Sequence, residues 1–295
     1  MAYRSFKYSD NIYKLLTPKP AGLEQETKTV IHLLESDKPC MISRYGSGEL
    51  QTVCLMRYWP WLNLFKKRTY KLIGNNAGFF PVDKRHLEQF YKCYKESTNM
   101  MDVLVSWRLE EVLIRDWIKE KTYIQKSTLD NFYEHEQPWT QALKGKNILV
   151  VHPFAETIES QYANHRGELF ENPLVLPEFA SLQTVKAVQS IAGNPVEFDT
   201  WFDALAWMKN EISKKDFDIA LLGCGAYGLP LAAYVKSLGK KAVHMGGVLQ
   251  FLFGIKGKRY DESPNYSRYI NEYFVSPSEA DRPKMADKVE GGCYW

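Results

Sequence analysis

The stretch DIALLGCGAYG, from Asp218 to Gly228, joins a short apolar run to a turn that holds three glycines. The apolar run is typical of a strand buried on both faces. The residues that follow, LPLAAYVKSLG, have the pattern of a helix that ends at Gly239, and KKAVHMGG predicts the next strand. A strand, a helix and a strand at this spacing predict a right-handed βαβ unit in a parallel sheet.

The same alternation continues on the N-terminal side of this unit. Strands are predicted at PCMISRYG (39–46), MDVLVSW (101–107) and KNILVVHPF (146–154). Helices are predicted at 23–36, 47–59, 108–121, 155–165 and 198–215, the last with Asp199 or Thr200 as its N-cap. Residues 127–145 mix aromatic and polar side chains and predict either a linker or a helical cap.

This pattern favours an α/β protein with a doubly wound, mostly parallel, Rossmann-like sheet. We expect one domain over residues 1–295, with a helical lead at 1–38 and a C-terminal tail at 260–295. The chain is 45% hydrophobic, so it can bury a sizeable core without disulfides or a metal. Its net charge of +3 suits an anionic small ligand and is too small to indicate a nucleic-acid-binding protein.

Cysteine use and hydropathy predict the compartment. The chain has five cysteines, an odd number, without C-x-x-C spacing, which favours a reducing, cytoplasmic environment. The first residues lack an apolar signal core, and no run approaches the roughly 18 apolar residues of a spanning helix. The segment RYWPWLNLFKKRTYK (57–71) interleaves aromatic and basic residues. It indicates either contact with an anionic membrane surface or core aromatics beside a solvated basic face.

Three readings of the glycine turn remain open. Gly223, Gly225 and Gly228 match the G-x-G-x-x-G spacing of a dinucleotide-binding turn, in which the first two let backbone approach a pyrophosphate. Such a site normally adds an acidic residue about 20 positions later, yet there is no Asp or Glu from Ile219 to Tyr260. The turn therefore indicates NAD(P) binding, phosphate binding without a nicotinamide, or close packing of a strand on a helix.

A second turn, SRYGSGEL (43–50), follows the first predicted strand. Arg44 at a strand end can hold a diphosphate with two N–H groups. Gly46 and Gly48 flank Ser47, and Glu49 opens a helix, where it faces the positive end of the helix dipole. The alternative is a tight turn in which Glu49 is only a favourable charge at the helix start.

This second turn resembles the R-[FY]-G-D-G-E signature of bacterial glycosyltransferases with the GT-D fold. The matching residues are Arg44, Tyr45, Gly46, Gly48 and Glu49. The run HMGGVLQFLFGIKGKRY (244–260) and the ending EGGCYW are also similar to uncharacterised proteins of bacterial surface-polysaccharide loci.

In that family a D-x-E motif serves the nucleotide-sugar site, often with a divalent cation. The resemblance therefore implies that Glu49 is a catalytic residue at the donor sugar and a ligand to Mn²⁺ or Mg²⁺. Ser47 stands where the family has its aspartate. A hydroxyl is a poor replacement for a carboxylate ligand, so the metal dependence does not carry over intact.

Further candidates lie at other predicted strand ends. His152 ends a strand and precedes Glu156, which makes it a candidate base for a sugar hydroxyl, or a histidine that is only hydrogen-bonded near a helix start. His244 and Gly246 end the strand after the glycine turn, where His244 can donate to a phosphate oxygen. The basic residues further on are expected to neutralise a leaving diphosphate or to form a solvated loop; they are Lys256, Lys258 and Arg259.

The sequence thus predicts a glycosyltransferase. It would move a sugar from a nucleotide-diphosphate sugar to a glycan or lipid-linked acceptor in bacterial surface polysaccharide synthesis. Two alternatives stay open: an NAD(P)-dependent oxidoreductase, which rests on the glycine spacing alone, and a non-catalytic nucleotide-sugar-binding protein. The signatures of a zinc protease, a serine hydrolase and a P-loop ATPase are missing from the chain.

Overall fold

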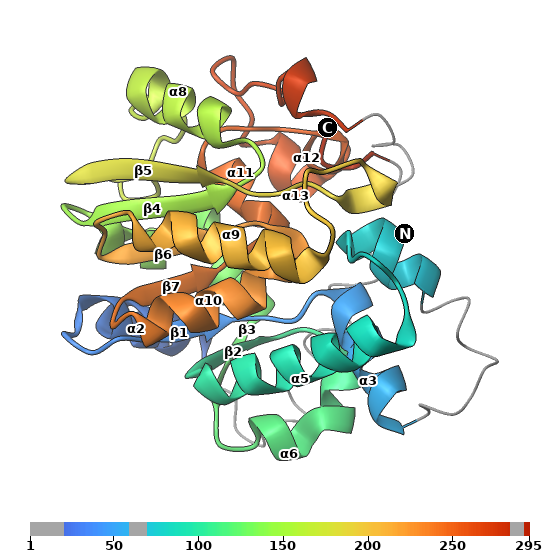
Figure 1. The fold of residues 1–295 in the computed structure, drawn as a ribbon. Helices are drawn as coiled ribbons and strands as arrows, with labels where there is room; N and C mark the ends of the chain where they lie inside the picture. The colour runs from blue at the N-terminus through green and yellow to red at the C-terminus, as the bar shows by residue number, and fades with distance from the viewer. Residues whose placement is uncertain (1–20, 59–69, 284–291) are drawn as a thin grey trace.

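The computed structural model describes residues 21–58, 70–283 and 292–295 (Figure 1). Within this part, seven strands form one sheet in the order β3-β2-β1-β7-β6-β4-β5, and every pairing is parallel. The strands are β1 (Met41–Ser43), β2 (Val103–Ser106), β3 (Thr122–Gln125), β4 (Asn147–His152), β5 (Ser181–Lys186), β6 (Ile219–Leu222) and β7 (Lys241–His244). The predicted Rossmann-like parallel sheet is confirmed.

Helices cover both faces of the sheet. Successive strand residues point to opposite sides, and both sets are apolar, so each face packs against its own layer of helices. Leu149 and Leu222 pack into one layer, with the helices α3 (Ser47–Tyr58), α5 (Lys84–Met100), α9 (Trp201–Ser213) and α10 (Gly228–Ser237). Val150 and Leu221 pack into the other, with α2 (Leu23–Glu35), α7 (Lys126–Asp130), α8 (Ala155–His165) and α11 (Leu249–Leu252). Figure 1 shows α9 and α10 in front of the sheet and α11 behind it. The fold is therefore doubly wound.

Most predicted elements form where their local signals place them. α9 begins after Thr200, whose hydroxyl accepts from the N–H of Asp203 while the Asp203 carboxylate bonds back to Thr200. Thr200, and not Asp199, is therefore the N-cap. Helix α5 is not predicted from the sequence, although Asp83 caps its first turn through the N–H of His86.

The helix predicted over 108–121 is wrong as a single element. The chain forms a 3₁₀ turn over Leu109–Ile114 and one short helix, α6 (Arg115–Ile118). The Glu111 carboxylate folds back and accepts from the N–H groups of Trp107 and Arg108, which holds the tight turn. Because β3 begins at Thr122, beside β2, only a short crossover fits between the two strands.

Two segments of uncertain character prove to be packed. Residues 127–145 contain most of α7 and two 3₁₀ turns, and Trp139 is fully buried, so this segment belongs to the core. The expected tail continues from α12 (Lys258–Asp261) into α13 (Pro264–Ser267), and Tyr266 and Phe274 pack into the layer that holds α11. At the other end of the chain, α2 adds Val30 to the same layer.

Most of the aromatic and basic segment 57–71 lies outside the described residues, and so does the predicted membrane contact. None of the described helices combines the length and the apolar character that a membrane span requires.

Candidate functional site

The predicted site residues converge at the carboxyl edge of the sheet. β1, β7, β6 and β4 are neighbours, and they end at Ser43, His244, Leu222 and His152. The turn after β1 carries Arg44 to Glu49, and the turn after β6 carries Gly223 to Gly228. Ligands of doubly wound sheets bind at this edge, so the two turns and both histidines lie where the fold forms its sites.

Ser43 and Arg44 are consecutive, yet they point to opposite layers. The Ser43 hydroxyl lies 3.0 Å from Nδ1 of His244, on the side of α10. The Arg44 guanidinium lies on the other side, where its Nη1 donates to Oδ1 of Asp130 in α7 at 2.7 Å. The end of β1 therefore contributes to both faces of the sheet.

His244 packs directly on Gly228, the third glycine of the turn. A Cβ at Gly228 would lie 2.1 Å from Nε2 of His244, so only glycine leaves room for the ring. Burial lowers the pKa of His244 to about 3, and the nearby charge of Arg44 acts in the same direction. The imidazole is therefore neutral near pH 7.

The first glycine of the turn has a similar role beside the other histidine. A Cβ at Gly223 would lie 2.7 Å from Cδ2 of His152 and 2.9 Å from the carbonyl oxygen of Gly246. From the sequence, we expect the backbone at Gly223 to approach a pyrophosphate. The imidazole of His152 occupies that space instead. Gly225 differs: it is exposed, its φ is +56°, and a Cβ there would have no neighbour within 4 Å. Of the three glycines, Gly225 is the open one.

Arg44 belongs to a buried group of charges. The Lys126 ammonium also donates to the Asp130 carboxylate. Burial by itself would raise the pKa of Asp130, but Arg44 and Lys126 outweigh it and hold that pKa below its ordinary value. Burial lowers the pKa of Lys126, and the charges of Arg44 and Arg259 add to this effect against the attraction of Asp130. Arg44 and Lys126 thus share the carboxylate of Asp130, and Arg259 lies close enough for its charge to act on Lys126. These three residues are here called the cation cluster.

The second edge of the Arg44 guanidinium faces the turn after β7. Gly246 has a φ of +64°, and a Cβ on it would lie 3.2 Å from Nη2 and 3.3 Å from Nε of Arg44. Arg259 stacks on the ring of Tyr294 at 4.4 Å from its centroid, and its Nη2 donates to Sγ of Cys293. Arg44 and Gly246 therefore lie against each other, and Arg259 lies close enough for its charge to act on Lys126.

The other basic residues of that segment point elsewhere. Lys256 pairs with Asp261 at 3.8 Å, and Lys258 pairs with Glu262 at 3.9 Å. These two lysines match the alternative of a solvated basic loop better than a direct role at the cation cluster.

Glu49 lies in the first turn of α3 and folds back over the loop. A Cβ at Gly46 would lie 2.1 Å from its Oε2, which explains the glycine there. Gly48 packs on Leu72, and Ser47 is half-buried beside them. In the described part of the chain, no three His, Cys, Asp or Glu side chains are grouped so that they could hold a metal ion. One carboxylate and one hydroxyl fit a Mg²⁺ or Mn²⁺ site poorly.

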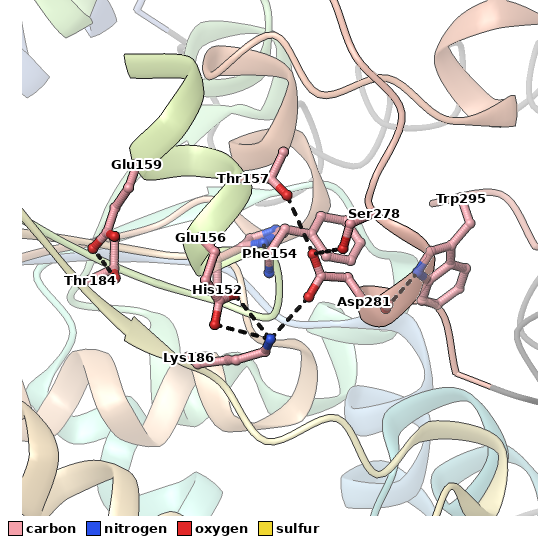
Figure 2. Close-up of polar contacts among 10 residues, drawn as sticks. All are labelled: His152, Phe154, Glu156, Thr157, Glu159, Thr184, Lys186, Ser278, Asp281 and Trp295. Atoms are coloured by element: carbon pink, nitrogen blue, oxygen red, sulfur yellow. Dashed lines mark hydrogen bonds and ion pairs between the residues drawn. The ribbon is translucent and has the colours of Figure 1, made fainter. Parts of the chain in front are cut away.

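The sequence suggested that His152 works beside Glu156, but the two side chains have different partners. Its Nδ1 accepts from the N–H of Phe154 at 3.1 Å, and burial lowers its pKa to about 3 against the opposing charge of Asp281. Glu156 lies on the exposed side of α8 and binds the ammonium of Lys186 at 3.0 Å (Figure 2). The first turn of α8 therefore faces the end of β5. The sequence did not predict this strand.

Several polar residues at this edge were missed by sequence reasoning. Asp130 is separated from Arg44 by 86 residues, and no local pattern links them. Glu111 is fully buried, and burial raises its pKa to about 7 despite hydrogen bonds from Ser106 and two backbone N–H groups. Lys186 and Asp281 meet beyond β5 at 3.1 Å. Among these residues, only Glu111 could have been proposed from the sequence, because it comes shortly after the end of a predicted strand.

Comparison with known proteins returned no matching family model, no matching curated protein and no matching solved structure. A functional assignment for this chain therefore rests on the geometry and chemistry of the site.

Proposed function

We propose that this chain is a glycosyltransferase that moves a sugar from a nucleotide-diphosphate sugar to a glycan or lipid-linked acceptor. The proposal is supported above all by the cation cluster at the carboxyl edge of the sheet. Arg44 and Lys126 both bind the carboxylate of Asp130, and the charge of Arg259 acts on Lys126. A diphosphate is a ligand that such a gathering of cationic side chains favours.

The orientation of Arg44 supports this assignment. Asp130 takes the Nη1 side of the guanidinium, while Nε and Nη2 face Gly246. Those two N–H groups are the pair with which an arginine binds a phosphate in two parallel hydrogen bonds. Asp130 acts as a positioning residue, because it fixes the plane of the guanidinium before a ligand arrives.

In the proposed reaction, the bond between the sugar carbon and the diphosphate oxygen breaks. A new bond forms between that carbon and an acceptor hydroxyl oxygen, and the hydroxyl proton passes to a base or to water. Negative charge develops on the departing diphosphate, where Arg44 and Arg259 stabilise it. Glu49, on the same turn as Arg44, is assigned to the donor sugar. The site supplies one carboxylate there, so no step is assigned to a metal.

The alternatives predict different ligands. An oxidoreductase would need space beside Gly223 and Gly228, where His152 and His244 pack instead. A non-catalytic binding protein would hold a nucleotide sugar without turnover, which a single carboxylate at the turn also allows. Fluorescence titration with NADH and NADPH tests the first alternative, and donor binding without hydrolysis or transfer indicates the second.

The decisive experiment measures hydrolysis and transfer with UDP, GDP and dTDP sugars, using a glycan array for the acceptor. Arg44→Lys keeps the charge but loses the two-pronged contact, so we expect donor affinity to fall about tenfold or more. The control is Arg268→Lys, because Arg268 pairs with Glu134 on the exposed surface. Absence of binding and turnover across the whole panel would refute the proposal.

A further inference from the structure

A second polar region lies beyond the ends of β4 and β5, at the same edge of the sheet. It lines an open hollow of about 510 Å³, a volume within the usual range of small-molecule sites of roughly 300–1,000 Å³. The first turns of α8 form one wall, the end of β5 forms the floor, and residues 275–281 form the other wall. Its main polar residues are Glu156, Thr157, Ser160, Lys186, Ser278 and Asp281.

Lys186 lies between two carboxylates in this hollow (Figure 2). Its ammonium contacts Glu156 at 3.0 Å and Asp281 at 3.1 Å. Burial opposes the charge, but the hydrogen bonds to both acids outweigh it and raise the pKa of Lys186. An ammonium has three N–H groups, and three oxygens already accept from this one: Oε1 and Oε2 of Glu156 at 3.2 and 3.0 Å, and Oδ1 of Asp281 at 3.1 Å. Lys186 therefore adds a fixed positive charge to the hollow.

Asp281 organises the facing wall. Its side chain is only 3% exposed, and Oδ2 accepts from the hydroxyl of Ser278 at 2.8 Å and from that of Thr157 at 3.3 Å. The indole N–H of Trp295 donates to the Asp281 carbonyl oxygen. Because both hydroxyls spend their proton on Asp281, each presents an oxygen acceptor to the hollow.

The charge of the hollow selects the class of ligand. Glu156 and Asp281 carry two negative charges and Lys186 one positive, so a diphosphate is repelled here and drawn to the cation cluster instead. The hollow offers several acceptor oxygens and few donors. A neutral molecule with many hydroxyl groups matches this balance.

We infer that this hollow binds a neutral saccharide and is the acceptor site of the proposed transferase. This role rests on the proposed function, whereas saccharide binding does not. The donor diphosphate and the acceptor then occupy separate regions of one edge of the sheet. The diphosphate lies near the ends of β1 and β7, and the acceptor lies near the ends of β4 and β5. β5 is the last strand of the sheet, so a longer saccharide can extend past it into solvent.

The test uses backbone-amide NMR of the full chain with methyl glucoside, methyl galactoside, N-acetylglucosamine, maltose, lactose and cellobiose. We expect millimolar binding with shifts concentrated at 156–160 and 275–281. Glu156→Gln should weaken binding about tenfold, as loss of a hydrogen bond to a charged group typically does. Ser160→Trp should abolish it by filling the hollow from an exposed helix position.

Glu159→Gln is the matched control. Glu159 is an exposed carboxylate on the same helix, bonded to Thr184 at 2.6 Å, and it lies outside the hollow (Figure 2). The inference is overturned if no sugar in the panel shifts the hollow residues, or if Glu159→Gln weakens binding as much as Glu156→Gln.

Donor measurements separate this inference from the proposed function. Glu156→Gln and Ser160→Trp should leave the affinity for UDP, GDP or dTDP sugars and the rate of donor hydrolysis unchanged, while they raise the acceptor KM. A chain that binds saccharides in the hollow but neither binds nor hydrolyses any donor would retain the saccharide site and lose the transferase assignment. Donor turnover with an unchanged acceptor KM in both variants would remove the acceptor role.

Discussion

Arg44 and Asp130 form an ion pair of 2.7 Å between side chains that are 8% and 2% exposed. The pair joins the turn after β1 to α7, and Lys126 binds the same carboxylate. Charges buried in this way depend on one another, because removal of one leaves the others without compensation.

Asp130→Asn should therefore destabilise the fold strongly. It leaves Arg44 and Lys126 buried without their carboxylate, which typically costs about 3–5 kcal/mol. The control is Asp116→Asn, since Asp116 pairs with Arg57 but is 58% exposed, and a pair of this kind contributes at most about 1 kcal/mol. Urea unfolding of both variants measures the difference, and equal losses would contradict the buried-pair interpretation.

Substitutions in the glycine turn should separate packing from backbone strain. Gly228→Ala places a methyl group against His244 and should cost about 1–3 kcal/mol. Gly225→Ala meets no neighbour and should cost about 1–2 kcal/mol through its positive φ alone. Adding His244→Ala should recover part of the Gly228→Ala cost and none of the Gly225→Ala cost. Additive free energies of unfolding in both double variants would show that the imidazole is not the obstacle.

Stability should fall in mildly acidic solution. The pKa values of His152 and His244 are lowered to about 3 in the fold, against about 6.5 in the unfolded chain. The unfolded chain therefore binds these protons first, so the stability present above pH 6.5 is lost progressively as the pH falls toward 3.

The measurement is urea unfolding between pH 7.5 and 5. Near pH 6 each histidine should contribute a slope of about 1 kcal/mol per pH unit, and His244→Asn should remove one such contribution. An unchanged slope in this variant would mean that His244 is protonated in the folded protein.

Metal removal should affect the proposed transferase only in part. Glu49 is the one carboxylate of its turn, and Ser47, two residues before it, offers only a hydroxyl. We expect EDTA to lower sugar transfer incompletely, Glu49→Gln and Arg44→Ala to lower it about a hundredfold or more, and Ser47→Asp to increase the dependence on Mn²⁺. Complete loss with EDTA and full recovery with Mn²⁺ in the unmodified chain would require carboxylates other than Glu49 in the site.

The sequence predicts the architecture well, because its elements carry local signals. The apolar run before Gly223 forms β6, and the cap at Thr200 marks the start of α9. Parallel pairing then brings the strand ends together. β5 was missed because SLQTVK is largely polar, as an edge strand with one neighbour can be.

The interior of the site could not be predicted in the same way. The residue that fills the space beside Gly228 is His244, at the end of the neighbouring strand β7. The sequence of the turn itself does not identify it. The partner of Arg44 depends on where α7 packs. The alternation along β7 did hold one usable signal, since it places His244 on the face opposite Val243.

The opposite orientation of Ser43 and Arg44 at the end of β1 has a consequence for protein engineering. Ser43 serves the imidazole on one face of the sheet and Arg44 the carboxylate on the other. Removing or adding one residue between 41 and 44 would exchange the two faces and break both contacts together. Libraries that vary side chains at fixed length can therefore explore this site, whereas insertions and deletions there will eliminate it.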